Sequence, residues 1–250
     1  MSAVGFTREE RGAIRAQLLD AARADQEIVG AAITGSGAIE TEDDWSDIDL
    51  AFAVADGVRL PDVLARWTDE VDAHFRVVHY WDLLADDRVF RVFLLSNGLE
   101  IDLAFMPAAA FGARGAKFRL VFGEARDIGV AGADTRTLLG MGWHHILHAT
   151  VCIARGRPWE AEWLMSAARD YTLALACARE GLPTAYARGV DELPFSTRSA
   201  FDATLARSAD LSELRRGLVA LRSLFIAEVR ALDPALAGRL DALLPSPDPE

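Results

Sequence analysis

Three aspartates and a glycine-serine turn are the residues of this 250-residue chain whose types and spacing could carry chemistry. Asp47 and Asp49 lie two apart in DIDLAFAV, which has the composition of a buried strand, so both side chains are expected on one face. Asp102 stands in IDLAF at 101–105, which repeats IDLAF at 48–52. Carboxylates held this close repel one another unless a cation such as Mg²⁺ lies between them. If the two strands are neighbours, the three carboxylates form a patch that could hold two metal ions.

The Gly35-Ser36 turn directly precedes the acidic stretch and suits the binding of a phosphate. Glycine lets the backbone approach a phosphate closely, and a helix beginning near Ala38 would aim its amide hydrogens at that phosphate. The segment GSGAIE lacks the third glycine of a dinucleotide fingerprint, and GxxxxGK[ST] does not occur, which excludes a P-loop. The alternative is a solvated strand edge behind an ordinary surface turn. Turn, Asp-x-Asp pair and third aspartate together favour the phosphate site.

The elements that would position these residues change in character along the chain. An α/β front half extends to about residue 125, and a helical back half follows it. The Asn97-Gly98 pair predicts a tight turn between two strands. Strands are expected at 28–34, 47–54, 76–81, 88–95 and 99–106, and helices from the Thr7–Glu10 capping box to Glu27 and at 60–75, 133–155, 160–180, 199–208 and 211–231.

The composition limits the partners and the compartment. With 38 acidic against 26 basic residues, the net charge of -12 argues against nucleic-acid binding and suits solubility or a cationic small molecule. The cysteines, Cys152 and Cys177, are too few for a disulfide framework. No apolar run approaches the ~18 residues that span a bilayer, and the first residues do not resemble a signal peptide. We therefore expect a soluble cytoplasmic protein without nucleic-acid or membrane partners.

The motifs of the front half resemble the signature of the polymerase-beta-like nucleotidyltransferase superfamily. In this sequence the signature consists of Gly35-Ser36, Asp47-Ile48-Asp49 and Ile101-Asp102-Leu103, within roughly residues 28–106. The resemblance implies an α+β domain with a small mixed sheet, two Mg²⁺ ions, and transfer of a nucleoside monophosphate from a nucleoside triphosphate such as ATP. It also implies that Asp47 and Asp49 bind both metals, and that Asp102 binds the catalytic metal and helps to activate the attacking group.

The helical half resembles that of the aminoglycoside and lincosamide nucleotidyltransferases, through residues 155–176 and 187–194. In some relatives a glutamate of this half is the general base, and here the candidate is Glu162, with Glu160 in reserve. Arg169 lies two helical turns after Glu162 on the same face, where it would contact the triphosphate. The alternative is a solvated charge pair, and the lysine expected one turn after the base is missing. The implied domains are 1–125, the nucleotidyltransferase domain; 126–244, an all-α helical bundle that binds the substrate; and 245–250, a disordered tail.

Several other side chains have a functional and a structural interpretation. His144 and His148 are four apart, a spacing that can bind zinc, but a third ligand is missing and ordinary packing or surface exposure is favoured. Lys117 and Arg119 could reach a triphosphate or simply be solvated. Three tryptophans could stack on a base or a sugar, although core packing is favoured for aromatics at helical spacing: Trp143, Trp159 and Trp163.

The function expected from these residues is Mg²⁺-dependent transfer of AMP from ATP to a hydroxyl of a small molecule. An aminoglycoside-type antibiotic is the candidate acceptor, which would make antibiotic resistance the biological role. Two alternatives remain open at this stage: AMP transfer to a protein side chain, and a catalytically silent nucleotide-binding regulator. The acceptor, the preferred nucleotide and the choice between monomer and homodimer also remain open.

Overall fold

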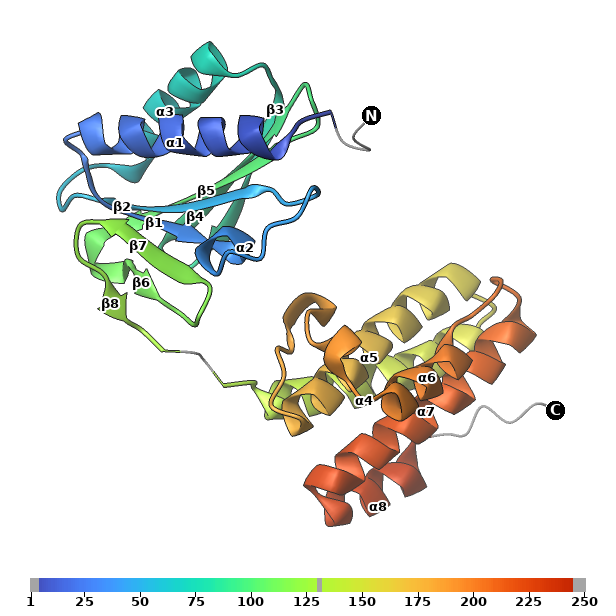
Figure 1. Ribbon diagram of the computed structural model, residues 1–250. Helices are drawn as coiled ribbons and strands as arrows, with labels where there is room; N and C mark the ends of the chain where they lie inside the picture. The colour runs from blue at the N-terminus through green and yellow to red at the C-terminus, as the bar shows by residue number, and fades with distance from the viewer. Residues whose placement is uncertain (1–4, 130–131, 245–250) are drawn as a thin grey trace. The chain divides into compact units, whose positions relative to one another are not determined.

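The computed structural model describes residues 5–129 and 132–244 (Figure 1). The chain divides into two compact units, Met1–Ala131 and Gly132–Glu250. This division lies a few residues after the expected boundary at 125. The tail expected at 245–250 lies outside the described residues.

A six-stranded mixed sheet forms the first unit, with the strand order β3-β4-β5-β2-β1-β7. β2 and β5 are parallel, and the other neighbouring strands of this sheet are antiparallel. A separate two-stranded pair joins β6 and β8. The strands are β1 Ile28–Thr34, β2 Ile48–Val54, β3 Val77–Ala85, β4 Arg88–Leu95, β5 Glu100–Pro107, β6 Gly112–Ala113, β7 Phe118–Phe122 and β8 Arg126–Asp127.

Two helices, α1 (Arg8–Ala24) and α3 (Leu60–His74), cover one face of the sheet (Figure 1). α1 begins at the predicted capping box, in which the Thr7 hydroxyl accepts from the Glu10 amide and the Glu10 carboxylate accepts from the Thr7 amide. The shorter elements are α2 (Gly35–Ala38) and the 3₁₀ turn η1 (Ala108–Ala110). These elements confirm the α+β class with a mixed sheet.

The two faces of the central strands differ in residue size. On the side of α1 and α3, large apolar side chains such as Leu50 and Phe52 are fully buried, and the Phe52 ring packs on Trp67 of α3. The opposite face carries small residues, including Ala51 and Ala53, which belong to a second, smaller core around Phe111. Because strand side chains alternate between faces, Asp49 of β2 lies on this second face with Ala51 and Ala53.

The second unit is a helical bundle, which confirms the predicted all-α class of this half. Its core includes Ile146, Met165, Leu221 and Phe225. Within the described residues, no helix is long and apolar enough to cross a membrane. The elements are α4 Thr135–Ala154, α5 Pro158–Arg179, η2 Ala185–Ala187, η3 Val190–Glu192, α6 Phe195–Ala200, η4 Phe201–Thr204, α7 Leu211–Leu232 and α8 Pro234–Leu243.

The helices of this unit differ from the expected ones in two places. The helix expected at 199–208 begins earlier, at Phe195 directly after Pro194, and ends as the 3₁₀ turn η4 at Thr204. α8 was not expected. It begins at Pro234, and the Asp233 carboxylate caps it by accepting from the Leu236 amide at 2.9 Å. An aspartate followed by proline is a helix-start signal that the periodicity alone did not reveal.

Two glycines of α4 provide a matched pair for testing the bundle core. A Cβ on Gly142 would overlap the buried Phe225 ring, whereas a Cβ on Gly140 would meet no atom within 4 Å. We expect Gly142→Ala to lower the free energy of unfolding by about 1–3 kcal/mol through overpacking. Gly140→Ala should raise it by up to about 1 kcal/mol through helix propensity. Chemical denaturation of both variants measures the difference, and equal effects would contradict the close packing of α4 on α7.

Candidate active site

The candidate site lies on the parallel strands β2 and β5, which carry almost the same sequence side by side. Asp49 is the register partner of Asp102, and Leu50 is the partner of Leu103. Register partners project from the same face of a sheet, so the two carboxylates lie next to each other on the face opposite α1 and α3. The sequence repeat therefore does correspond to neighbouring strands.

Asp47 lies in the loop before β2, and not in the strand as expected. The physical reason is a competing partner for the backbone. Arg11 of α1 donates to the carbonyl oxygens of Asp43 at 2.7 Å and of Ser46 at 2.9 Å, so this segment is bound to a helix side chain rather than to a strand. Asp47 nevertheless remains close enough to Asp102 to raise the pKa of that carboxyl.

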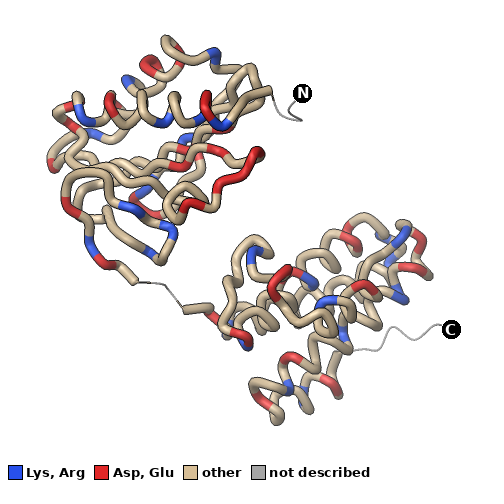
Figure 2. Tube along the Cα trace, in the orientation of Figure 1, with Lys and Arg blue, Asp and Glu red and all other residues tan. Residues whose placement is uncertain are grey.

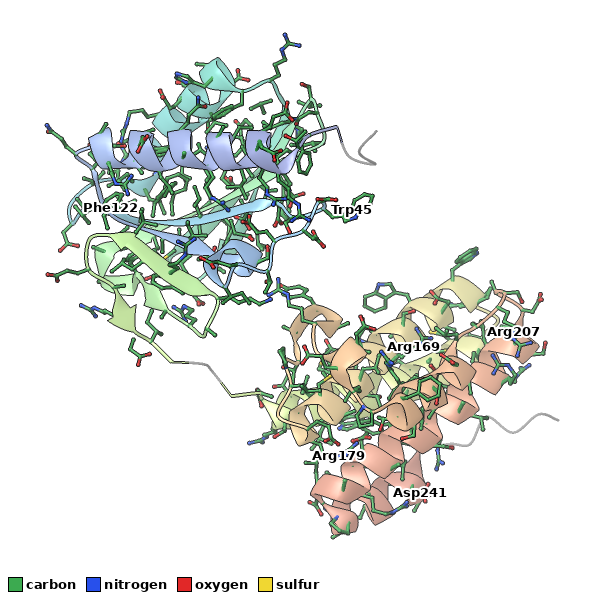
Figure 3. The ribbon with its side chains drawn as sticks, viewed as in Figure 1. Trp45, Phe122, Arg169, Arg179, Arg207 and Asp241 are labelled. Atoms are coloured by element: carbon green, nitrogen blue, oxygen red, sulfur yellow. The ribbon has the colours of Figure 1, made fainter. Side chains whose placement is uncertain are left out.

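Cations of α1 hold the acidic loop in place. Arg11 is only 3% exposed and lies 3.4 Å from the Glu42 carboxylate, to which Arg15 donates at 2.6 Å. Figure 2 shows the acidic residues of this loop as a red stretch next to the sheet. The exposed Trp45 lies in the same loop (Figure 3). Without the two arginines, the repulsion between the loop and the strand carboxylates would favour a more open loop.

The Gly35 turn lies directly against Asp49. Gly35 has a φ of 60°, and a Cβ at this position would overlap the Asp49 carboxylate. Glycine is therefore needed both for the left-handed backbone and for the close approach. α2 begins at Gly35 and not near Ala38, because the glycine turns the chain as soon as β1 ends. With four residues, α2 is too short to act through a helix dipole, so a phosphate would depend on the glycine backbone and on Ser36.

A cation from β7 lies at the same turn. Arg119 is the register partner of Ile33 and donates to the Gly37 carbonyl oxygen at 3.2 Å. Lys117 is exposed one residue before β7 begins. Arg119 thus contacts the turn segment at Gly37, but as the partner of Ile33 it projects from the sheet face of α1 and α3, opposite the carboxylates.

Burial and neighbouring charge act together on Asp102. Burial, followed by Asp47 and Glu100, raises the pKa of Asp102 to about 7. Its Oδ1 atom is buried and accepts no hydrogen bond from the described residues. An anion in this position is costly without a compensating partner.

Glu100 is a site residue that the sequence analysis missed. It lies two residues before Asp102 on β5, and burial followed by Asp47 raises the pKa of its carboxyl. A signal was present in the sequence, because Glu100-Ile101-Asp102 repeats the spacing of Asp47-Ile48-Asp49.

The carboxylates suit a hard divalent cation such as Mg²⁺. Oδ1 of Asp102 offers an unused oxygen beside Asp49, and the Gly35 backbone lies directly against the Asp49 carboxylate. Within the described residues, no three His, Cys, Asp or Glu side chains are grouped as the ligands of one metal ion. Mg²⁺ is compatible with this arrangement, because it is commonly held by one or two protein carboxylates and completed by water and phosphate oxygens. The set of Asp47, Asp49 and Asp102 stays a prediction.

In the helical unit, Glu162 and Arg169 are connected through Ser166 of the same helix. The Ser166 hydroxyl donates to the Glu162 carboxylate at 2.8 Å, and Arg169 Nη1 donates to Ser166 Oγ at 3.3 Å. Arg169 also donates from Nε to the Thr204 hydroxyl and from Nη2 to the Thr204 carbonyl oxygen, and thereby joins α5 to η4 (Figure 3). Burial lowers the pKa of Arg169. The reserve residue Glu160 pairs with Arg157 at the exposed start of α5.

The partner Thr204 could not be foreseen, because it lies 35 residues from Arg169 in the sequence. Two donor nitrogens of Arg169 make this internal junction, and the third donates to Ser166 of its own helix. The roles of Glu162 as a base and of Arg169 toward a triphosphate stay predictions.

The tryptophans of the helical unit are more exposed than expected. Trp159 is 78% and Trp163 64% exposed, so their predicted packing into the core is wrong. The contacts between helices are made by smaller residues such as Ala149 and Ala161, which leave the indoles outside. Trp163 packs on His145, whose ring is also 5.4 Å from that of Tyr171.

His144 and His148 lie with their ring centroids 4.4 Å apart. Burial, followed by the charges of His148 and His145, lowers the pKa of His144. No third metal ligand joins them among the described residues.

Similarity to known proteins is found when structures are compared, and not when sequences are compared. No protein-family model matches the sequence, and no curated protein does. One similar structure is an aminoglycoside 6-adenyltransferase from Bacillus subtilis. The match covers 93% of this chain and 92% of the Bacillus subtilis chain, with 14% identity and a TM-score of 0.40. The chain is also similar over 92% of its length, and 77% of that chain, to a nucleotidyltransferase-like protein from Exiguobacterium sibiricum, again with 14% identity and a TM-score of 0.40.

The names of both structures refer to nucleotidyltransferases, the class of protein that the sequence motifs resemble. At this identity and TM-score, the likeness supports no statement about the activity or substrate of this chain. The function is therefore inferred from the site itself.

The raised pKa of Asp102 predicts a pH-dependent stability in metal-free buffer. Between the ordinary pKa of 3.8 and about 7, the folded protein keeps a proton that the unfolded chain releases. Stability should therefore fall as the pH rises through this range, and the loss is complete above it. We expect Asp102→Asn to raise the free energy of unfolding by about 1–3 kcal/mol at pH 8 and to have little effect near pH 4.

Thermal or urea unfolding across this pH range measures the effect, with the exposed Asp56→Asn as the control. Parallel stability profiles for the wild type and Asp102→Asn would show that Asp102 titrates normally in the folded protein.

Proposed function

We propose that this protein is a Mg²⁺-dependent nucleotidyltransferase that moves a nucleoside monophosphate from a nucleoside triphosphate to a hydroxyl of a small molecule. The observation that carries the proposal is the register pairing of Asp49 with Asp102 beside the Gly35 turn. The pairing places two carboxylates, one with an unused buried oxygen, next to a backbone turn that a phosphate can approach closely.

The triphosphate would bind at the Gly35 end of the site. The glycine backbone and the Ser36 hydroxyl offer hydrogen-bond donors. Lys117 is close to Arg119 in sequence and exposed, so it is available to the outer phosphates. The surrounding acids would repel a triphosphate on its own, which is the physical reason for requiring a divalent cation.

Asp49 and Asp102, with Asp47 from the loop, are the residues that would hold Mg²⁺. Bound Mg²⁺ would neutralise phosphate charge and stabilise the charge that develops during displacement. The acceptor oxygen forms a bond to the α-phosphorus, and the bond to the bridging oxygen breaks, so that pyrophosphate leaves with the electron pair. Asp102, whose Oδ1 accepts no hydrogen bond from the described residues, would help to activate the acceptor hydroxyl, and Asp102, Glu162 and Glu160 are the alternative bases for its proton.

The helical unit would supply the remaining groups. Glu162, whose carboxylate is held by Ser166, is the candidate general base toward the acceptor. Glu160 remains in reserve, and Arg169 is the candidate for a triphosphate contact. ATP is the proposed donor, and an aminoglycoside-type antibiotic is the proposed acceptor, because the net charge of -12 favours cationic ligands. Antibiotic resistance would then be the biological role.

Removing one site carboxylate at a time tests this proposal. We expect Asp49→Asn to lower the turnover with Mg²⁺ by at least about 100-fold, because transition-state electrostatics supply most of the acceleration in such a site. The measurement is pyrophosphate release with each nucleoside triphosphate and a panel of aminoglycosides and lincosamides, together with the mass of the product. Asp56→Asn is the matched control, because Asp56 is exposed shortly after the carboxyl end of the same strand.

A gain of one nucleoside monophosphate in product mass identifies the donor and the acceptor together. Undiminished turnover in a folded Asp49→Asn variant would disprove the assignment of the site. Nucleotide binding without metal-dependent product from any donor would favour a catalytically silent regulator.

A further inference from the structure

A single row of register partners crosses the sheet through the carboxylates. Asp49 pairs with Asp102, Asp102 with Val92 of β4, and Val92 with Trp81 of β3. Register partners share a face, so Trp81 projects from the same face as the two aspartates. With neighbouring strands about 4.8 Å apart, the Trp81 backbone is roughly 10 Å from that of Asp102, about the span of one or two sugar-sized rings.

Apolar side chains of and beside this row form a surface that we call the Trp81 platform, made of the exposed Trp81 and Leu94 with the buried Val92 next to them. Trp81 is 51% and Leu94 43% exposed, whereas the centre of the same face is covered by the small core around Phe111. Leu94 is the register partner of Glu100, so a carboxylate borders the platform as well. A large exposed indole next to acidic groups is typical of a recognition surface rather than of a protein interior.

Interactions on the opposite face hold the platform rigid. Arg91, 8% exposed, binds both carboxylate oxygens of Asp82 at 2.7 Å and donates to the Leu64 carbonyl oxygen of α3 at 2.9 Å. The Arg91 guanidinium also lies 4.9 Å from the centre of the Tyr80 ring. Trp81 lies between Tyr80 and Asp82 on β3, the two residues of this strand that Arg91 contacts. An edge strand with one neighbour is thereby fixed to a helix, and a ligand on the indole would need little ordering of the backbone.

The in-line geometry of phosphoryl transfer indicates which of the two substrates would lie on the platform. The phosphate turn at Gly35 lies on the β1 side of the carboxylates, and the platform lies on the β4–β3 side. In phosphoryl transfer the attacking and leaving oxygens lie roughly in line on opposite sides of the phosphorus. If pyrophosphate leaves toward the turn, the attacking hydroxyl approaches from the side of Asp102 and the platform.

We propose that the Trp81 platform binds the acceptor, a small molecule with an apolar ring face that lies on the indole and an ammonium group that faces Glu100. The choice of acceptor over another ligand rests on the proposed function. A ring on the indole places a hydroxyl within reach of Asp102, and the ammonium is favoured by the carboxylate of Glu100, the register partner of Leu94. Trp81 is thus a specificity-determining residue of the site.

Binding in the absence of nucleotide tests this assignment, with kanamycin and lincomycin as probes, because each carries a ring and an amine. Calorimetry should show at least one probe bound to the wild type. We expect Trp81→Ala to weaken that binding at least about fivefold and Trp81→Phe to weaken it less, as expected for a ring stacked on an indole. Glu100→Gln should also weaken it. Leu84→Ala is the matched control, because Leu84 is 72% exposed on the same strand but projects from the opposite face.

ATP affinity and melting temperature are measured on the same variants, and both should be unchanged in Trp81→Phe. Equal probe affinity in the wild type and Trp81→Ala overturns the proposal, and so does the absence of probe binding to the wild type. A change of oligomeric state in Trp81→Ala, seen by sedimentation without loss of probe affinity, would assign the platform to a second copy of the chain instead. Failure of the proposed function would give a different result from failure of this proposal: turnover would be absent while the probe still binds at Trp81.

Discussion

Repulsion between carboxylates on two adjacent parallel strands is the constraint on which the rest of the first unit depends. Asp49 and Asp102 are register partners, and Asp47 and Glu100 each lie two residues before one of them. Burial makes this arrangement more costly, as the pKa of Asp102 near 7 shows. A fold that keeps such an array at the cost of its own stability is typical of a site that binds a cation or performs catalysis.

The neighbouring elements restrain these carboxylates without neutralising Asp102. The Gly35 backbone lies against Asp49, where any side chain at position 35 would overlap the carboxylate. The buried Arg11 binds the backbone of the acidic loop and fixes the segment that ends at Asp47. Both restraints come from outside the two strands, and they leave Oδ1 of Asp102 without a hydrogen bond from the described residues. A ligand that brings positive charge would therefore meet carboxylates that are already held in place.

The same sheet face combines this charge with an apolar surface. One strand beyond Asp102, the row continues through Val92 to the exposed Trp81. On the reverse face, Arg91 joins β3 to α3 and holds this edge in register. Charge at the centre, a phosphate turn on one side and an indole on the other would allow two ligands to be arranged in line. The helical unit has its own polar network around Arg169, whose donors join α5 to η4.

The sequence by itself determined the elements and their chemistry: the capping box of α1, the alternating strands, the glycine turn and the repeated IDLAF segment. These signals are local, because side-chain periodicity and backbone sterics act over a few residues. Tertiary structure alone decided that β2 and β5 are neighbours, that Asp47 leaves the strand to follow a loop bound by Arg11, and that Arg169 meets Thr204. It also brought Trp81 into the row of Asp102. Strand order, register and burial depend on contacts between residues far apart in the chain, which periodicity does not encode.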